Sequence, residues 1–527
     1  MSGERWTRWG WVAVLAALAY VVKHGVTYGV GDHDEMLPQL LRLIDPELYP
    51  RDWFVVEQGG RFTVRTPFLW LLRVVALVMP VGAAVGVVQA AGLVGVGAGA
   101  YRLACALDAE RSAAALATVV AVGVVPTWAL SGSALAFRAL VPEMLAWAVA
   151  LPAVVWVIEG KPVRGGALLG AAAYLQLLVG ALTTGVLGLA IVFGALGGTT
   201  RARWATALRL GGAALAVALP LVLFVLHDRS TGPPIPTDGL SSYFLLAELR
   251  LPHHYLPSLF GADRWLRFAL VAVPGIAALA WLRRRGRPLV FVERFGLAVA
   301  LVCGVAWPLV EAADSLFVAQ LQVFKTTVPL VTLFVVAIAA AGLDALPARL
   351  RALADAPFRH PRWAWGGTLA AVALAGALVA VGPLRAKAGP LMRDADEVAV
   401  EAWARANTPV DALFVVPPSN TSFRTASRRS VAITYKPTSF QEGSTHVWFD
   451  RLLTVAPAAA DSPARGFAFA AALDAAYAAN GPADWQRLAD TWGVDYALVD
   501  RERTPTPPDA EPVFVSGRWA IVPLRTR

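Results

Sequence analysis

The chain has 527 residues, of which 57% are hydrophobic and only 16% are charged, whereas an ordinary soluble domain carries about 25% charge. This composition excludes a purely soluble protein, because a soluble fold has no place to hide so much apolar surface. The formal net charge of +9 comes from basic residues in short clusters between apolar runs, a distribution that indicates membrane topology and excludes nucleic acid as the expected partner.

Apolar runs recur along the chain at about the length that crosses a hydrocarbon core of about 30 Å. These runs must be helical, because lipid offers no partner to an unpaired backbone N–H or C=O group. The sequence therefore predicts a polytopic α-helical membrane protein with about eleven transmembrane helices, at residues 9–28, 84–104, 113–130, 142–158, 166–182, 184–198, 207–226, 266–282, 294–311, 316–341 and 363–382.

The Lys and Arg clusters between these helices all fall on one side when the helices are threaded alternately across the membrane. By the positive-inside rule that side is the cytoplasm. We therefore expect a multi-pass protein of the inner (plasma) membrane with a cytoplasmic N-terminus. Phe62–Pro80 is apolar but interrupted by Arg65, Pro67 and Arg73, so we interpret it as interfacial or re-entrant. The expected outer segments are 29–83, 131–141, 227–265, 312–315 and 383–527.

The character of the sequence changes after Pro383, where charge rises and strand-like runs alternate with helical patterns. We predict a transmembrane domain at 1–383 and an extracytoplasmic α/β domain at 384–527. The second domain is expected to contain helices at 394–406 and 484–492, strands at 412–416, 431–435 and 496–499, and a closing hairpin at 513–515 and 519–522.

The richest candidate site follows the first helix, where Asp32, His33, Asp34 and Glu35 are consecutive. Grouped acids perturb one another's pKa or share a cation, which suits a general base or a divalent metal site. Asp32 and Asp34 are the candidate catalytic residues, and His33 and Glu35 candidate substrate ligands. The alternative is an acidic loop that simply stays solvated beside the bilayer.

A second candidate is the pair His253 and His254, held in an outward loop between Pro252 and Pro257. Histidines here suit a metal or a phosphate, and a divalent cation shared by Asp32, Asp34 and His253 is one hypothesis. The alternative is a pair of surface histidines.

Two further candidate substrate ligands are basic. Arg138 lies in an outward loop, and Lys325 lies inside an apolar helix, where it needs a partner or an anionic ligand. Snorkelling towards an interface is the alternative for Lys325. In the outer domain, a basic and aromatic surface or merely scattered surface charge is expected from Phe423-Arg424, Arg428-Arg429, Lys436 and Trp448–Arg451.

The layout resembles the GT-C superfamily of membrane glycosyltransferases, with Asp32 and Asp34 where those enzymes carry an acidic motif and Phe62–Pro80 where they carry interfacial helices. The segments 34–54, 252–255 and 403–451 are also similar to an uncharacterised family of bacterial multi-pass proteins with a GT-C-like layout.

The resemblance implies transfer of a sugar from a polyprenyl-phosphate donor to an extracytoplasmic glycan or protein acceptor. Asp34 or Asp32 would take the acceptor proton, and Lys325, Arg138 and the two histidines would hold the phosphate. Two other functions stay open, namely a transporter or flippase of lipid-linked or anionic substrates, and a non-catalytic protein of cell-envelope assembly.

Overall fold

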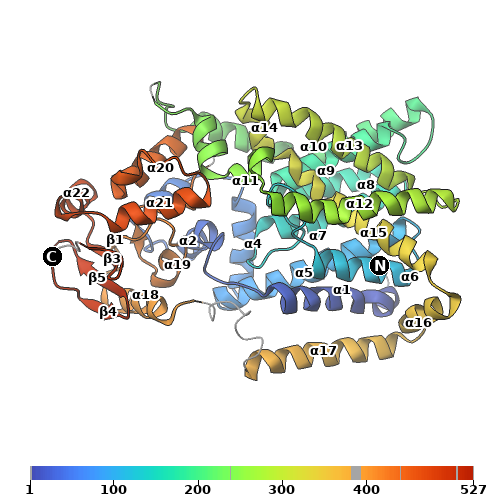
Figure 1. The fold of residues 1–527 in the computed structure, drawn as a ribbon, viewed down its shortest axis with the longest axis horizontal. Helices are drawn as coiled ribbons and strands as arrows, with labels where there is room; N and C mark the ends of the chain where they lie inside the picture. Colours follow the sequence, from blue (N-terminus) through green and yellow to red (C-terminus); the bar gives the residue numbers. More distant parts are fainter. Residues whose placement is uncertain (1–2, 238, 382–392, 440, 506–508, 526–527) are drawn as a thin grey trace. The chain divides into compact units, whose positions relative to one another are not determined.

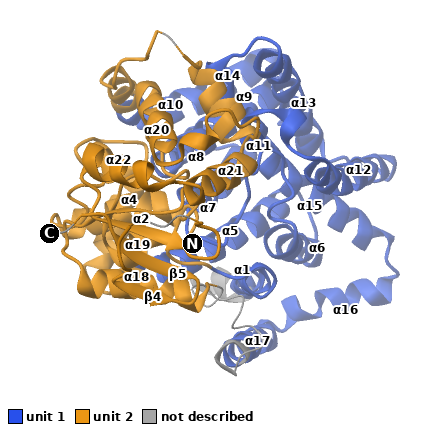
Figure 2. Ribbon diagram, turned by 60° about the vertical axis from the view of Figure 1, so that its left-hand side comes forward, with its two compact units in different colours: residues 1–26, 83–222, 253–389 blue, residues 27–82, 223–252, 390–527 orange. Residues whose placement is uncertain are grey.

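A computed structural model describes residues 3–237, 239–381, 393–439, 441–505 and 509–525. The chain forms two compact units, each assembled from three separate stretches of sequence (Figure 2). Unit 1 consists of Met1–Val26, Ala83–Val222 and His253–Gly389, and unit 2 of Thr27–Gly82, Leu223–Pro252 and Pro390–Arg527. The C-terminal part of the chain therefore packs together with the first predicted outer loop. The expected boundary between 383 and 384 lies outside the described residues.

Unit 1 is helical (Figure 1). The helices that lie wholly or mainly in it are α1 (Gly3–His24), α5 (Val81–Ala106), α6 (Arg111–Thr118), α7 (Pro142–Ile158), α8 (Pro162–Leu175), α9 (Leu177–Val192), α10 (Thr200–Ser230), α11 (Pro252–Tyr255), α12 (Ala262–Arg284), α13 (Val290–Glu311), α14 (Leu316–Leu321), α15 (Thr327–Ala345), α16 (Ala348–Arg359) and α17 (Pro361–Val381).

Five helical segments of the described chain are long and apolar enough to cross a membrane, by length and composition. They are Val81–Ala106, Thr200–Ser230, Ala262–Arg284, Val290–Glu311 and Leu316–Ala345, and each overlaps one of the eleven predicted spans. The prediction of a polytopic helical membrane protein is confirmed, whereas the count of eleven stays a prediction. The last segment is not one continuous α-helix, because Gln322 adopts a left-handed conformation between α14 and α15.

The helices over 162–192 differ from the spans expected at 166–182 and 184–198. The break falls at Gln176, which is extended and whose side-chain oxygen accepts a hydrogen bond from the Leu178 N–H at 3.0 Å. The Gln side chain thus caps α9 and fixes the break seven residues before the expected one. Likewise α1 ends at His24, because Gly25 takes a positive φ of 77°.

Unit 2 combines a mixed five-stranded sheet with short helices. Strands β2, β1 and β3 are parallel, and β5 and β4 extend the sheet in antiparallel fashion, giving the order β2-β1-β3-β5-β4. The strands are β1 (Leu413–Val415), β2 (Ser430–Val431), β3 (Tyr496–Asp500), β4 (Phe514–Ser516) and β5 (Trp519–Pro523), and the helices are α2 (His33–Ile44), α3 (Trp53–Gly59), α4 (Thr66–Ala76), α18 (Ala395–Asn407), α19 (Phe423–Ser427), α20 (Glu442–Val455), α21 (Phe467–Ala478) and α22 (Pro482–Trp492).

The predicted α/β character of the C-terminal part is confirmed, including the closing β4–β5 hairpin. The strand expected at 431–435 was wrong in length, since β2 ends at Val431. The chain leaves the ladder there because the next residues serve other contacts. Thr434 donates a hydrogen bond to the Asp34 carboxylate at 3.1 Å, and the Tyr435 N–H donates to the Pro418 carbonyl at 2.7 Å.

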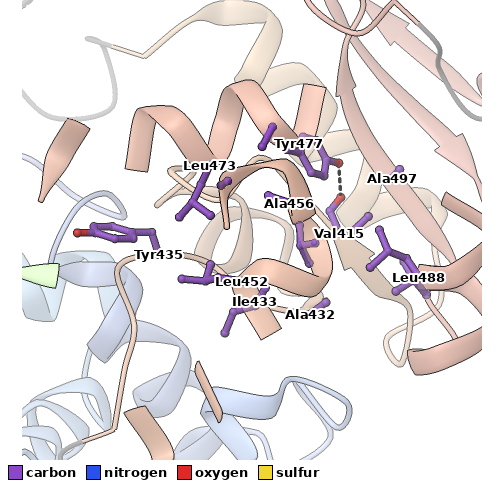
Figure 3. Close-up of a cluster of buried hydrophobic side chains, with 14 of the residues drawn as sticks. Val415, Ala432, Ile433, Tyr435, Leu452, Ala456, Leu473, Tyr477, Leu488 and Ala497 are labelled. Atoms are coloured by element: carbon purple, nitrogen blue, oxygen red, sulfur yellow. Dashed lines mark hydrogen bonds between the residues drawn. The ribbon is translucent and has the colours of Figure 1, made fainter. Parts of the chain in front are cut away.

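The core of unit 2 lies between the sheet and helices α20, α21 and α22 (Figure 3). Tyr477 of α21 is buried in this core and donates a hydrogen bond to the Leu498 carbonyl at 2.8 Å, with the Val415 carbonyl at 3.3 Å. Its hydroxyl therefore ties α21 to two adjacent strands. Phe469 of α21 lies in the core, whereas Phe467, two residues earlier and so on the other side of the helix, is exposed.

We predict that Phe469→Ala destabilises unit 2 by about 3 to 5 kcal/mol, because it opens a cavity in this core. Phe467→Ala, the matched control on the same helix, should change the free energy of unfolding by no more than about 0.5 kcal/mol. Denaturant unfolding of the detergent-solubilised protein compares the two variants. Equal losses of stability would contradict the core assignment.

Candidate active site

The acidic residues of the first predicted outer loop form the start of α2 and do not lie in an open loop. Gly29 and Gly31 take positive φ values of 75° and 64°, which the turn into α2 requires. The Gly31 N–H donates to Thr421 Oγ1 at 3.0 Å, and the Gly29 N–H donates to His33 Nδ1 at 2.9 Å. His33 is buried, and its Nδ1 must be unprotonated to accept this bond, so the ring holds the turn in place.

Asp34 is fully buried, and its side chain contacts Arg424 of α19 at 2.7 Å. The same guanidinium contacts Asp52 at 2.7 Å, so one buried Arg lies between two buried carboxylates. Asp52 also accepts hydrogen bonds from the Val431 N–H at 2.9 Å and the Val55 N–H at 3.1 Å. Both carboxylates are therefore satisfied by protein groups.

The guanidinium group of Arg424 keeps its positive charge although it is buried. Burial lowers the pKa of its guanidinium, but Asp34 and Asp52 together raise it well above the ordinary value. Arg424 thus stays a cation, and it fastens residues of the predicted first outer loop to α19 and β2 of the sheet.

Asp32 is the accessible carboxylate of the group. Its side chain is 43% exposed and lies 2.6 Å from the Lys436 ammonium, which is 27% exposed. Burial raises the pKa of Asp32, yet Lys436 and the neighbouring Arg65 outweigh this effect and hold the pKa below its usual value. Asp32 is therefore a carboxylate at neutral pH, able to accept a proton or a hydrogen bond.

Glu35 completes the group as a buried anchor between two arginines, Arg65 and Arg250. Arg250 lies 3.1 Å from Glu35 and also donates to the Lys436 carbonyl at 2.5 Å, so it links α2 to the loop that carries Lys436. We call Asp32, Glu35, Arg65, Arg250 and Lys436 the charged cluster. Its three cations exceed its two carboxylates by one positive charge, which favours an anionic ligand.

Three of the candidate substrate ligands, His253, His254 and Arg138, belong to unit 1. His254 Nδ1 donates to the Ser131 carbonyl at 2.5 Å, and its ring centroid is 4.4 Å from that of His253. The His253 carbonyl accepts a hydrogen bond from Arg264 at 2.8 Å. Arg138 is exposed, and its carbonyl accepts from the Gln89 side chain at 2.6 Å. The roles proposed for these three side chains stay predictions.

Lys325 has the partner that its depth in an apolar segment demands. Its ammonium lies 2.7 Å from Glu143 in the first turn of α7, and both side chains are buried. The pair ties the start of α7 to the turn between α14 and α15. Snorkelling to an interface is therefore excluded for Lys325 in this structure.

For the outer domain we expected either a basic and aromatic surface or scattered surface charge. Both expectations were wrong for the three residues that follow. Arg424, Arg429 and Trp448 are buried, because each satisfies groups inside unit 2. Sequence reasoning also assigned no role in the site to Arg65 or Arg250. The sequence did contain a signal for each of them. Arg65 is a charge that interrupts an apolar stretch, and Arg250 lies three residues before the histidine pair.

The residues proposed for a divalent cation do not fit one. No group of three or more His, Cys, Asp or Glu side chains in the described part of the chain has the arrangement of a metal site. Asp34 is committed to Arg424, and Asp32 to Lys436. We therefore derive no step that uses a metal.

Solved structures of membrane glycosyltransferases share this fold. ArnT from Cupriavidus metallidurans, bound to undecaprenyl phosphate, matches with a TM-score of 0.52 at 15% identity, over 98% of this chain and 97% of that one. The archaeal oligosaccharyltransferase AglB from Archaeoglobus fulgidus, in complex with an inhibitory peptide and a dolichol-phosphate, matches with a TM-score of 0.51 at 13% identity, over 95% of this chain and 70% of that one.

These likenesses establish that the chain has the fold of the GT-C superfamily of membrane glycosyltransferases, as the sequence predicted. Residues 395–455 match a domain of unknown function, DUF6798. No curated protein matches the chain. The matched segment contains α18, α19 and α20, and with them Arg424 and Lys436.

We predict that Arg424→Met destabilises the protein by about 3 to 5 kcal/mol, because it leaves Asp34 and Asp52 buried without a cation. The control is Arg405→Met, which changes an exposed Arg of the neighbouring α18. Thermal unfolding followed by circular dichroism measures both. A midpoint for Arg424→Met equal to that of the control would show that the buried ion pairs contribute little.

Proposed function

We propose that this protein is a membrane glycosyltransferase that transfers a sugar from a polyprenyl-phosphate donor to an extracytoplasmic acceptor, with Asp32 as the general base. The observation that carries the proposal is the accessible Asp32 carboxylate, 2.6 Å from Lys436 in a cluster with one excess positive charge. The fold supports the class of reaction, since it matches along nearly the whole chain an enzyme whose structure contains undecaprenyl phosphate.

The base is Asp32 and not Asp34, although the sequence offered both. Asp34 has no exposed surface for a substrate, and its oxygens accept from Arg424 and Thr434. Asp32 is the N-cap residue of α2, but its side chain makes no capping hydrogen bond, so its second oxygen is available to an acceptor hydroxyl. We assign Asp34 to positioning, through the ion pair with Arg424.

The reaction needs one proton transfer and one displacement. The acceptor hydroxyl gives its proton to Asp32 as its oxygen attacks the anomeric carbon, and the bond from that carbon to the phosphate oxygen breaks. The polyprenyl phosphate leaves with the electron pair, and its developing negative charge is stabilised by Lys436 and Arg65. Arg250 stays paired with Glu35 and holds the loop of Lys436.

The orientation follows from the same proposal. Unit 2 carries the charged cluster and lies on the extracytoplasmic side of the inner membrane, as the positive-inside pattern predicts for residues 29–83 and 384–527. The donor's polyprenyl tail then stays in lipid while its phosphate reaches the cluster.

We predict that Asp32→Asn lowers the rate of sugar transfer by about 10²- to 10⁴-fold with folding intact, because the amide cannot accept the proton. The rate is measured in proteoliposomes with a panel of radiolabelled undecaprenyl-phosphate sugars. Since the pKa of Asp32 is lowered, the wild-type rate should persist from neutral pH downwards and fall only below the usual carboxyl range. Asp45→Asn, an exposed Asp at the end of α2, is the control and should stay active. Transfer by Asp32→Asn at the wild-type rate would exclude Asp32 as the base.

A second prediction concerns the phosphate. Lys436→Met and Arg65→Met should each weaken binding of undecaprenyl phosphate roughly tenfold or more, because each removes a cation from the cluster. Binding to the detergent-solubilised protein is measured by native mass spectrometry. Arg487→Met, which removes a surface cation of α22 paired within its own helix, should leave binding unchanged. If all three variants bind equally, the cluster is not the phosphate site.

A further inference from the structure

Unit 1 contains a cavity of about 670 Å³ that the proposed reaction does not use. Its walls come from α1, from the C-terminal end of α5, from the start of α6, from the end of α7 and from α16. All of these helices belong to unit 1, so the cavity lies within one compact unit. Its volume falls in the range of roughly 300 to 1,000 Å³ that is usual for small-molecule sites.

The charged side chains on the wall of this cavity carry an excess of positive charge. Arg102 at the end of α5 and Arg111 at the start of α6 line it, together with Glu159. Glu159 forms an ion pair with Lys161 at 2.7 Å, so its charge is already compensated. Arg102 is partly exposed and Arg111 is exposed, so both guanidinium groups have surface to offer a ligand. Two such groups on one wall favour an anion, and above all a phosphate.

Aromatic rings form another part of the wall. Tyr101 stacks on Trp9 and on Phe358, with centroid separations of 5.1 Å and 6.4 Å. Phe358 also packs against Trp11, at 5.3 Å. Because these rings already stack on one another, they leave little free face for a nucleobase, which disfavours a nucleotide as the ligand. Trp and Tyr side chains are instead typical of the depth at which lipid head groups lie.

A second cavity, of about 340 Å³, adjoins the first, since Ala106 and Ile158 line both. Its charged residues are Asp108 and Arg287, and Arg287 is paired with Asp344 at 3.2 Å. The rest of its lining is largely apolar and includes Leu196, Leu282 and Phe291. A basic cavity beside a mainly apolar one fits an amphiphile, which has a charged head and a hydrocarbon chain.

Helix α16 gives this part of unit 1 the character of a membrane surface. Phe358 in its last turn lines the cavity, and none of the twelve residues of the helix is buried. Leu350 and Leu353 are exposed and lie three residues apart, hence on one face, and Arg349 and Arg359 are exposed as well. An exposed amphipathic helix with Leu and Arg side chains is typical of a helix that lies on a bilayer containing anionic lipids.

We infer that the larger cavity binds the phosphate head group of an anionic phospholipid through Arg102 and Arg111, with an acyl chain of that lipid in the adjoining apolar cavity. Both arginines lie between predicted spans on the side that the positive-inside pattern assigns to the cytoplasm, so the lipid belongs to the cytoplasmic leaflet. This choice of leaflet rests on the proposed topology, whereas the binding of the head group does not.

The experiment is native mass spectrometry of the full-length detergent-solubilised protein, with phosphatidylglycerol as the probe and phosphatidylcholine of the same acyl chains for comparison. The wild type should bind phosphatidylglycerol more strongly, because only that lipid has a net negative charge. Arg102→Gln and Arg111→Gln should each weaken its binding about tenfold, since each removes a charged donor to the phosphate. Arg201→Gln, which changes an exposed arginine at the start of α10, is the matched control and should bind as the wild type does.

Two further arms identify the source of the phosphate and the location of the site. Glycerol 3-phosphate has the phosphate without acyl chains, and at the same concentration it should not displace phosphatidylglycerol. Lys436→Met, which tests the charged cluster of unit 2, should bind phosphatidylglycerol as the wild type does. Failure of this inference and failure of the proposed function can therefore be told apart.

Each outcome decides the inference. Weaker binding by the two cavity variants alone, with thermal midpoints in phosphatidylcholine near that of the wild type, supports it. If Arg102→Gln unfolds at a lower temperature, the exposed Arg111 decides. Equal binding of the two lipids by the wild type, an equal loss in Arg201→Gln or Lys436→Met, or displacement by glycerol 3-phosphate overturns it.

Discussion

The arrangement of unit 2 depends on one buried cation, Arg424, held between Asp34 and Asp52. Burying three charged groups is expensive, and the cost is offset only because the guanidinium contacts both carboxylates and neighbouring N–H and O–H groups satisfy the remaining oxygens. The pairing joins residues some 370 to 390 positions apart in sequence. It makes the segment before and within α2 a part of the same compact unit as the C-terminal sheet.

This constraint separates two acids that look equivalent in the sequence. Asp34 is buried in unit 2 and forms an ion pair with Arg424, whereas Asp32, two residues earlier, stays half exposed beside Lys436. Gly29 and Gly31, with positive φ, set the turn that produces this difference. In the proposed function this rigid pair supports Asp32, since a base on a loosely held turn would lose its alignment with the substrate.

Local patterns predicted the local structure well. The apolar runs fixed the helical membrane class, and the strand-like runs near residues 413, 496 and 519 correspond to β1, β3 and β5. Lys325 was expected to need a partner, but nothing in its own segment identified Glu143, 182 positions away. The same limit hid the burial of Arg424 and the roles of Arg65 and Arg250. An Arg on a short helix has the same local sequence signature whether its partner is water or a carboxylate contributed by a distant segment.

The break at Gln176 is another case in which the hydropathy pattern gave the wrong helix boundary. The Gln176 side chain caps α9 and so ends one helix within a run that is otherwise largely apolar. In unit 2 the polar contacts carry a further distinction. The charged cluster has one excess positive charge and includes the exposed Asp32, whereas the neighbouring group of Asp34, Arg424 and Asp52 is buried and has one more carboxylate than it has cations.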